Sequence, residues 1–411
     1  MSRRVRLILV TVVLLGSLPA FPAMATGATS TCEGGTQLSG AVYRICMPER
    51  GAWNGDLVVY AHGYVAFNEP VEIPEDQLVL PDGTSIPEIV NRLGFAFATT
   101  SYSTNGLAVL EGIEDLRDLV DIFSATHVQP RRVYLVGGSE GGIITALTVE
   151  QFPEVFDGGL AACGPIGDFR WQVNYWGDFR VVFDYFFPGL IPGSPVDIPE
   201  EVIDNWDEVY EPEIREAIRS NRDATEQLLR VARARIDRRD PASVETTTLG
   251  LLWYNVFATN DGVVKLGGQP FDNVHRLYLG SNNDFRLNLE VQRFRADPAA
   301  LDEIQVHYQT TGDLISPLVT LHTTGDPIVP YWHELLYRAK VLASDSRLLH
   351  SNIPVFRYGH CNFKASEALV GFVLLVLKVT GQELTGAENV LPDADSRAEF
   401  WQLARQYGAL R

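Results

Sequence analysis

The chain has few basic residues and few cysteines. Lys and Arg number 33 against 52 for Asp and Glu in 411 residues, which gives a formal net charge of −19. Binding to nucleic acid or to an anionic membrane surface needs a basic face, so this charge argues against both partners. The sequence also lacks zinc-type Cys/His spacing, a dinucleotide-binding G-x-G-x-x-G and any long repeat. We therefore expect neither a metal nor an organic cofactor.

Apolar residues are plentiful. They make up 46% of the chain, while charged residues make up 21%, so a large core can form and a disordered protein is excluded. The length exceeds that of one ordinary domain. An acidic, globular enzyme or binding protein fits this composition.

The first 25 residues have the pattern of a secretory signal. Arg3, Arg4 and Arg6 precede the apolar run 7–18, and Ala23-Met24-Ala25 ends the segment with small residues around one larger one. A bilayer-spanning helix needs about 20 apolar residues, and this run is shorter. We expect cleavage after Ala25 and a secreted or extracytoplasmic protein with no stable membrane anchor. Sec and twin-arginine export both remain open.

Export into an oxidising compartment would allow the cysteines to pair. Cys32 and Cys46 flank a glycine-containing stretch and a strand-like run, 41–45. This arrangement predicts a disulfide, Cys32–Cys46, across an N-terminal hairpin.

Short apolar runs alternate with helical patterns in the first part of the chain. Such strands, apolar on both faces, predict a mostly parallel sheet covered by helices on both faces, an α/β fold. The predicted strands are 57–61, 95–100, 133–136, 159–163, 318–321 and 353–356, and the predicted helices are 109–123, 143–151, 332–342 and 365–379, the last closing the chain.

The alternation stops between residues 166 and 315. Residues 169–187 contain nine aromatic side chains, and an acidic stretch with helical periodicity follows them. The block predicts a mainly helical cap or lid inserted late in the sheet. The domains are then a signal at 1–25, a core at 26–165 and 316–411, and the cap at 166–315.

The motif most informative about chemistry surrounds Ser139. Gly137-Gly138-Ser139-Glu140-Gly141 is a G-x-S-x-G placed directly between a predicted strand and a predicted helix. A sharp turn at this point projects the serine hydroxyl clear of the sheet and leaves room only for small residues two positions before and after it. The serine is the candidate nucleophile.

With this motif in this setting, the chain resembles the α/β-hydrolase family of serine hydrolases. The resemblance covers most of the sequence outside the cap, and it implies a secreted esterase or lipase-like enzyme. Family members carry their catalytic residues in the order Ser, Asp or Glu, His. The acid and the histidine are therefore expected after Ser139.

Two similar segments compete to supply the acid. Asp313 precedes the predicted strand 318–321, and Asp326 follows it in a Gly-Asp-x-x-Val-Pro setting that looks like the family's acid loop. Working residues in open α/β sheets gather beyond the carboxyl ends of the strands, which selects Asp326. For the base, His350 lies near the start of the last strand and His360 follows its end. We therefore expect a triad of Ser139, Asp326 and His360.

The remaining site predictions concern the oxyanion hole and the second pair of cysteines. Ala61-His62-Gly63-Tyr64 resembles the family's His-Gly loop, so the backbone N–H groups of Tyr64 and Glu140 are the expected oxyanion donors, and His62 is expected to shape the loop. Cys163 and Cys361 both fall at the carboxyl edge of the sheet and could form a bond across 198 positions, or remain separate thiols.

The aromatic cap suggests a carboxylic ester with an apolar or aromatic acyl group, from a small molecule or a polymer. Trp171, Trp176 and Phe183 are the expected substrate-binding residues, although plain packing within the cap would equally explain the aromatics. Two other functions stay open: a serine peptidase of the prolyl-oligopeptidase type and a non-catalytic binding protein. Acyl-chain length, alcohol portion, oligomeric state and cap mobility are not predicted.

Overall fold

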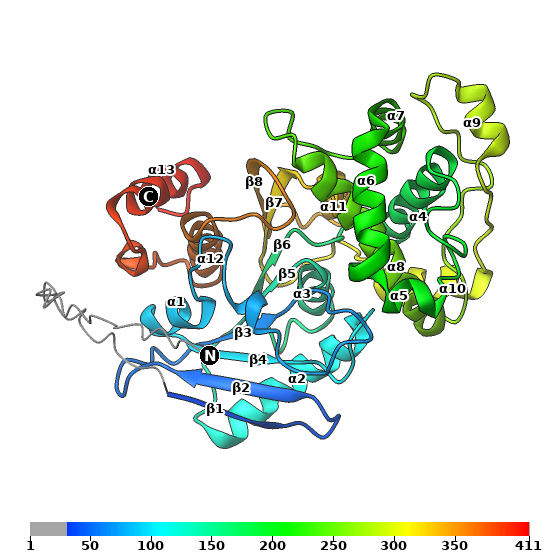
Figure 1. Ribbon diagram of the computed structural model, residues 1–411. Coiled ribbons are helices and arrows are strands. Elements are labelled where there is room, and N and C mark those ends of the chain that lie inside the picture. Colours follow the sequence, from blue (N-terminus) through cyan, green and yellow to red (C-terminus); the bar gives the residue numbers. More distant parts are fainter. Residues whose placement is uncertain (1–30, 411) are drawn as a thin grey trace, which may run out of the picture.

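A single eight-stranded sheet organises the computed structural model, which describes residues 31–410 (Figure 1). The expected signal segment and its cleavage position after Ala25 lie outside the described residues. The strands lie side by side in the order β1-β2-β4-β3-β5-β6-β7-β8. Their bounds are β1 Thr31–Thr36, β2 Val42–Met47, β3 Leu57–Ala61, β4 Ala96–Thr100, β5 Val133–Gly138, β6 Gly158–Ala162, β7 Leu318–Gly325 and β8 His350–Tyr358.

The strands from β4 to β8 are parallel, and the N-terminal hairpin adds an antiparallel edge. β1 pairs with β2 and β2 with β4 in antiparallel register, whereas each pair from β4–β3 to β7–β8 is parallel. The central strands are apolar and buried on both faces, as the continuous hydrophobic runs require. The working edge of the sheet is therefore the one where the parallel strands end.

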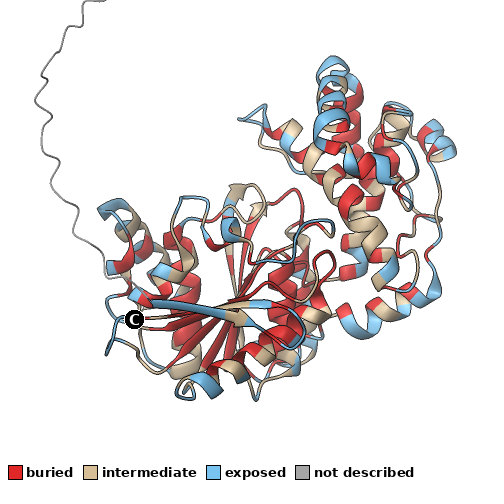
Figure 2. Cartoon of the chain, turned by 60° about the horizontal axis from the view of Figure 1, so that its bottom comes forward, coloured by how far each residue is buried: buried red, intermediate tan, exposed pale blue. Residues whose placement is uncertain are grey.

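Helices cover both faces, and Figure 2 shows the buried strands between them. α2, α3 and α11 share one hydrophobic core with the sheet, and α1, α12 and α13 share the other. Their bounds are α1 Ile86–Arg92, α2 Val109–Thr126, α3 Glu140–Gln151, α11 Trp332–Ala343, α12 Ala365–Thr380 and α13 Ala394–Tyr407. This strand order with helices on both faces is the α/β-hydrolase fold, so the expected fold class is confirmed.

The prediction that a helix ending near Val379 closes the chain was wrong. α13 follows it and packs along α12, with Phe400 and Ala404 fully buried. The apolar positions of α13 are sparse, because this helix contributes only one narrow face to the core. A weak apolar stripe of this kind is easily overlooked in a polar C-terminal segment.

Between β6 and β7 the chain leaves the sheet and forms a group of helices, here called the helical insertion (Figure 1). It has its own hydrophobic core, which also includes Ile328 and Val329 from the loop after β7. The expected boundaries, 166 and 315, enclose it. Its helices are α4 Phe169–Phe186, α5 Glu200–Asp204, α6 Glu211–Ser220, α7 Arg222–Ala232, α8 Ser243–Lys265, α9 Asp284–Glu290 and α10 Pro298–Glu303.

The described part of the chain contains no helix that is both long enough and apolar enough to cross a bilayer. It contains two disulfides, and one of them joins the edge hairpin. Cys32 and Cys46 face each other in the β1–β2 register with their Cα atoms 4.0 Å apart.

Removing the hairpin disulfide should lower stability. Its cysteines are separated by 14 positions, and closing a loop of this size is worth about 3 kcal/mol. We expect the double variant Cys32→Ser, Cys46→Ser to lose up to about 3 kcal/mol of unfolding free energy. Urea unfolding followed by tryptophan fluorescence measures this loss. Ser39→Ala, in the same hairpin, is the control, and an unchanged midpoint for the double variant would contradict the prediction.

Candidate active site

Ser139 occupies a strained turn between β5 and α3. Its φ is +57°, a conformation that few non-glycine residues adopt, and α3 begins at the next residue. A Cβ on Gly137 would lie 2.2 Å from the carbonyl oxygen of Gly141, and one on Gly141 would lie 2.0 Å from that of Ala61. Both contacts are impossible, so the turn requires glycine at both positions. The turn places Ser139 at the N-terminus of α3, where the helix dipole is positive.

A chain of hydrogen bonds links Ser139 to His360 and Asp326. The Ser139 Oγ and His360 Nε2 are 2.8 Å apart, and His360 Nδ1 and Asp326 Oδ2 are also 2.8 Å apart. Asp326 is fully buried, whereas the His360 side chain is 18% exposed. The geometry fits a hydroxyl whose proton can pass to an imidazole held by a carboxylate.

The structure separates the two aspartates that compete for the acid position. Asp326 directly follows β7 and contacts His360, whereas Asp313 precedes β7 in an exposed loop at the other end of that strand. The Asp313 backbone N–H donates to Thr311 Oγ1, which also bonds to Glu150. The Asp313 loop is thus anchored to α3 at its C-terminal end, away from Ser139.

Backbone groups hold the Asp326 carboxylate from its other side. Its Oδ1 accepts hydrogen bonds from the N–H groups of Ile328 and Val329 at 2.8 and 2.9 Å. Burial alone would raise the pKa of Asp326, but its interactions with His360 and His322 outweigh burial and lower it to about 2. The carboxylate is therefore ionised at neutral pH.

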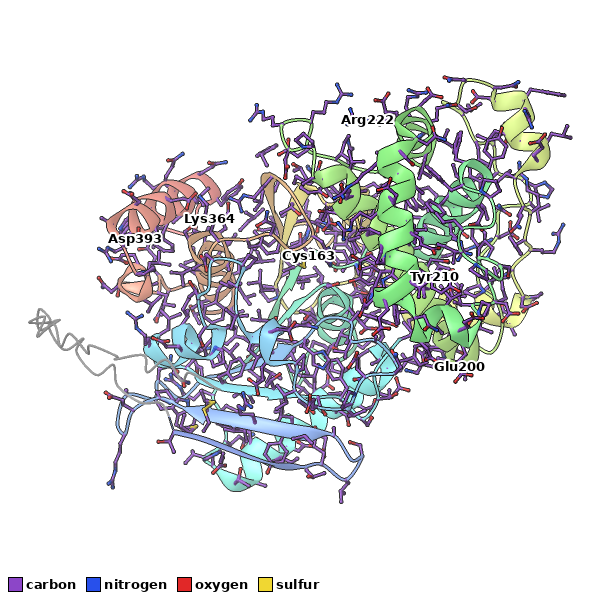
Figure 3. The ribbon with its side chains drawn as sticks, viewed as in Figure 1. Cys163, Glu200, Tyr210, Arg222, Lys364 and Asp393 are labelled. Atoms are coloured by element: carbon purple, nitrogen blue, oxygen red, sulfur yellow. A yellow bond between two sulfur atoms is a disulfide. The ribbon has the colours of Figure 1, made fainter. Side chains whose placement is uncertain are left out.

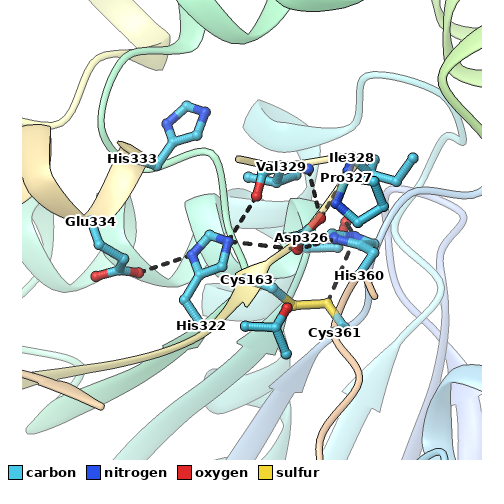
Figure 4. A network of polar contacts seen from close by, with 12 residues as sticks. Cys163, His322, Asp326, Pro327, Ile328, Val329, His333, Glu334, His360 and Cys361 are labelled. Atoms are coloured by element: carbon cyan, nitrogen blue, oxygen red, sulfur yellow. Dashed lines mark hydrogen bonds and ion pairs between the residues drawn. A yellow bond between two sulfur atoms is a disulfide. The ribbon is translucent and has the colours of Figure 1, made fainter. Parts of the chain in front are cut away.

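Behind Asp326 lies a second histidine, which the sequence did not single out (Figure 4). His322, on β7, is fully buried between two carboxylates: its Nδ1 is 3.1 Å from Glu334 Oε1, and its Nε2 is 3.6 Å from Asp326 Oδ2. The Nε2 also hydrogen-bonds to the carbonyl oxygen of Val329 at 2.8 Å.

Both ring nitrogens of His322 therefore face acceptors, which requires a proton on each. Glu334 in turn accepts hydrogen bonds at its other oxygen from Thr320 Oγ1 and Asn352 Nδ2. Burial favours the neutral imidazole and lowers the pKa, but the two carboxylates outweigh burial and raise the pKa of His322 to about 10. The result is a buried cation that links Asp326 to Glu334 on α11.

The loop after β3 approaches Ser139 from the other side. Gln77 holds it: its Oε1 accepts the Gly63 N–H at 2.6 Å, and its Nε2 donates to the Tyr64 carbonyl oxygen at 3.2 Å. Within the described residues, no hydrogen bond to another part of the chain uses the Tyr64 N–H. Glu140 is the first residue of α3, so its N–H has no partner within that helix. Both expected oxyanion donors therefore lie in segments beside Ser139.

His62 packs within this loop. It is 2% exposed, its ring stacks on Tyr102 at 3.9 Å between centroids, and its Nδ1 donates to the Gly63 carbonyl oxygen. Burial lowers the pKa of His62 to about 4. The ring is neutral and, among the interactions of the described residues, makes no hydrogen bond to Ser139, which fits a role in shaping the loop.

The second disulfide joins the histidine loop to the sheet. Cys163 follows β6 and Cys361 follows His360, and the bond between them has a Cα–Cα distance of 5.5 Å. Figure 3 shows Cys163 where the sheet meets the helical insertion, which carries Glu200, Tyr210 and Arg222. Among the described residues, the one His/Cys/acid cluster tight enough for a metal is Cys163, His360 and Cys361. The two sulfurs are bonded to each other and are not thiolate ligands.

An apolar cavity of about 90 Å³, here called the insertion cavity, opens beside Ser139. Its walls come from α3, α4 and α8 and include Phe169, Trp176, Tyr254 and Ala258. Tyr254, on α8, stacks on Trp176 with 4.9 Å between centroids, and its hydroxyl contacts the Ser139 side chain. The sequence did not indicate Tyr254, since it lies in a long helix far from any motif.

Of the three expected substrate-binding aromatics, only Trp176 lines this cavity. Trp171 lies on a different face of α4 from Trp176. It is 54% exposed, and its ring packs edge-on against Trp332. Phe183 shares the Trp176 face but lies about 10 Å further along the helix, where it is fully buried against Phe187. Counting aromatics did not distinguish these positions, because helical phase and distance from Ser139 decide which side chain reaches the cavity.

One family model matches a segment of the chain. Residues 91–175 match the model of the prolyl oligopeptidase family (Peptidase_S9). This segment includes the Ser139 turn and part of α4 but covers only a minor part of the chain. No curated protein matches the chain by sequence.

Several solved structures are similar. Acylaminoacyl peptidase of Pyrococcus horikoshii is 12% identical over 81% of this chain and 37% of its own, with a TM-score of 0.39, so this chain spans well under half of that protein. Feruloyl esterase B of Aspergillus oryzae is 15% identical over 85% of this chain and 79% of its own, with a TM-score of 0.44. Candida antarctica lipase A is 14% identical over 92% and 85%, with a TM-score of 0.44.

The buried His322 cation should make stability fall at alkaline pH. Because its pKa is raised from 6.5 to about 10, its contribution is fully present below about pH 6.5 and is lost as the pH rises through about 10. We expect His322→Gln to lose about 3–5 kcal/mol of unfolding free energy at pH 6 and to show a weaker alkaline decline than the parent protein.

Urea unfolding at intervals from pH 6 to pH 10 measures both effects. His307→Gln is the matched control, because the His307 side chain is 48% exposed and its ion pair with Glu303 is long, at 3.9 Å. A parent protein whose stability does not change over this range would contradict a charged His322.

Proposed function

We propose that this chain, an α/β-hydrolase of the serine hydrolase type, cleaves carboxylic esters that have an apolar or aromatic acyl group. The observation that carries the proposal is the hydrogen-bonded series Ser139–His360–Asp326 beside an apolar cavity. Each of the three side chains meets a requirement of acyl transfer: a nucleophile, a base within reach of its proton, and a carboxylate that orients the base.

In the proposed reaction, His360 Nε2 takes the proton from Ser139 as the Oγ attacks the ester carbonyl. Asp326 stabilises the resulting imidazolium and keeps the ring oriented. The N–H groups of Tyr64 and Glu140 bind the oxyanion of the tetrahedral intermediate; one such donor is typically worth about 2.7–4 kcal/mol. His360 then protonates the leaving alcohol, and water, activated by the same imidazole, hydrolyses the acyl-enzyme.

The helical insertion acts as the cap in this proposal. Trp176 and Tyr254 come from its helices and stand over Ser139, so they would surround the acyl group. Glu140 is the one acidic residue in the lining of that cavity, and burial raises the pKa of its carboxyl to about 8. It is thus largely neutral at pH 7, which suits an apolar acyl group better than a charged one.

The main alternative is a serine peptidase of the prolyl-oligopeptidase type, and the family match over residues 91–175 favours it. The chemistry of the triad serves esters and amides alike. The apolar cavity favours the ester, because it offers few polar groups to a peptide backbone. A non-catalytic binding protein would have no need of the strained turn at Ser139.

We also propose a secreted or extracytoplasmic location, with small-molecule or polymeric esters as the partners and no metal or organic cofactor. The two disulfides support an oxidising compartment.

Ser139→Ala should abolish ester hydrolysis and labelling by a fluorophosphonate probe, because the nucleophile is removed while the turn keeps its small neighbours. Rates on p-nitrophenyl esters of graded acyl length, compared with matched p-nitroanilides, measure activity and separate an esterase from a peptidase. Ser124→Ala, on α2, is the control. Full activity in Ser139→Ala would rule out this nucleophile, and a preference for anilides would favour the peptidase.

Asp326→Ala and Asp313→Ala form a matched pair within two similar segments. Loss of Asp326 should lower kcat by roughly 10⁴-fold, since the imidazole loses its orienting carboxylate. Loss of Asp313 should have little effect, because it lies at the other end of β7. Steady-state kinetics on one p-nitrophenyl ester tests the pair, and the reverse result would assign the acid to Asp313.

A further inference from the structure

A second apolar cavity reaches Ser139 from the side opposite the helical insertion. Its volume is about 360 Å³, larger than that of the insertion cavity. Apart from Tyr254, its walls belong to the hydrolase core: side chains of the sheet form the floor, and α1 and α12 form the sides, with Ile86, Ile89, Leu369 and Phe372 among them. We call this space the core groove.

The two cavities meet at the serine. Ser139, Tyr64 and Tyr254 line both of them. The Tyr254 ring therefore stands between the cavities beside the Ser139 hydroxyl. A molecule whose reacting carbon is at Ser139 can place one part in each cavity.

The position of His360 distinguishes the two sides. His360 lines the core groove and not the insertion cavity, whereas Glu140, one of the proposed oxyanion donors, lines the insertion cavity and not the core groove. The leaving alcohol receives its proton from the imidazole, so it must depart on the side of His360. The acyl group then points toward the insertion cavity.

We propose that the core groove binds the alcohol part of the substrate, and that this protein acts on carboxylic esters of long, unbranched or otherwise slender apolar alcohols. This inference rests on the proposed esterase function. It specifies the alcohol part of the substrate, which the triad itself does not select. In the acylation step, the bond between the carbonyl carbon and the alcohol oxygen breaks. The acyl group stays on Ser139 Oγ, and the alcohol oxygen takes the proton from His360 Nε2.

The size and composition of the groove support an apolar alcohol. Its volume equals about twelve times the space that one water molecule occupies in the liquid, enough for a chain of several methylene groups. The polar side chains of the lining lie around Ser139: His360 hydrogen-bonds to its Oγ, Gln77 holds the adjacent Gly63 loop, and Tyr60 donates to the Gln77 carbonyl oxygen. A polar or charged alcohol would lose its hydration along the remainder of the groove without gaining hydrogen bonds.

Esters with one fixed short acyl group and primary alcohols from ethyl to decyl test the proposal. Burying each methylene should raise kcat/KM by up to about fourfold until the groove is filled. If kcat/KM stays constant or falls as the alcohol becomes longer, while the protein still hydrolyses the ethyl ester through Ser139, the core groove does not bind the alcohol. The proposed esterase function would then remain intact. Failure to cleave any ester would instead overturn the proposed function.

A second experiment fills each cavity with a larger side chain. Ala368, on α12, lines the core groove, and Ala258, on α8, lines the insertion cavity. Ala368→Phe should lower the decyl-to-ethyl ratio of kcat/KM at least tenfold, while Ala258→Phe should leave this ratio unchanged and alter the dependence on acyl length. Ala339→Phe, at an exposed position of α11, is the control for the substitution itself.

Urea unfolding shows whether Ala368→Phe folds. If it does not, Leu80→Trp, at a partly exposed position in the wall of the core groove, replaces it in the same measurement. If the groove variants change the dependence on acyl length and not that on alcohol length, the two cavities are assigned the wrong way round and the proposal fails.

Discussion

The candidate site depends on keeping one carboxylate ionised where water does not reach it. Asp326 is fully buried, and burial alone would favour its neutral form. Two backbone N–H groups, the imidazole of His360 and the cationic imidazole of His322 offset that cost together. The removal of any one of them leaves a charge in the interior with too few partners, which is among the most destabilising changes a protein can undergo.

This constraint explains the local design of the chain after β7. His322 lies on the strand, Asp326 in the loop that follows it, and Glu334 on α11, so one short stretch of sequence supplies both carboxylates and the cation between them. The same loop contributes Ile328 and Val329 to the hydrophobic core of the helical insertion. The packing of the insertion therefore bears directly on the backbone that holds Asp326.

His360 must be brought to Asp326 from a different strand, and several contacts restrain its loop. The Cys163–Cys361 disulfide ties the loop to the end of β6. Thr323, on β7, donates to the Gly359 carbonyl oxygen, and the Arg357–Glu367 ion pair joins β8 to α12. With α12 placed in this way, the core groove runs between it, α1 and the sheet and opens at His360. In our proposal, the core thus recognises the alcohol and the insertion recognises the acyl group.

Local signals in the sequence were sufficient for the sheet, the Ser139 turn, the hairpin disulfide and the placement of Asp326 and Asp313 at opposite ends of one strand. Each depends on neighbouring residues: an apolar run, glycines two positions from a serine, or the side of a strand on which an aspartate falls. The partnership of His322 with Glu334, the support of Gln77 and the place of Tyr254 were decided by tertiary structure, as was the bond between Cys163 and Cys361. These contacts join segments whose separation along the chain carries no periodic signal. The same holds for Trp171 and Phe183, because only the packed position of α4 determines which of its aromatic side chains faces the serine.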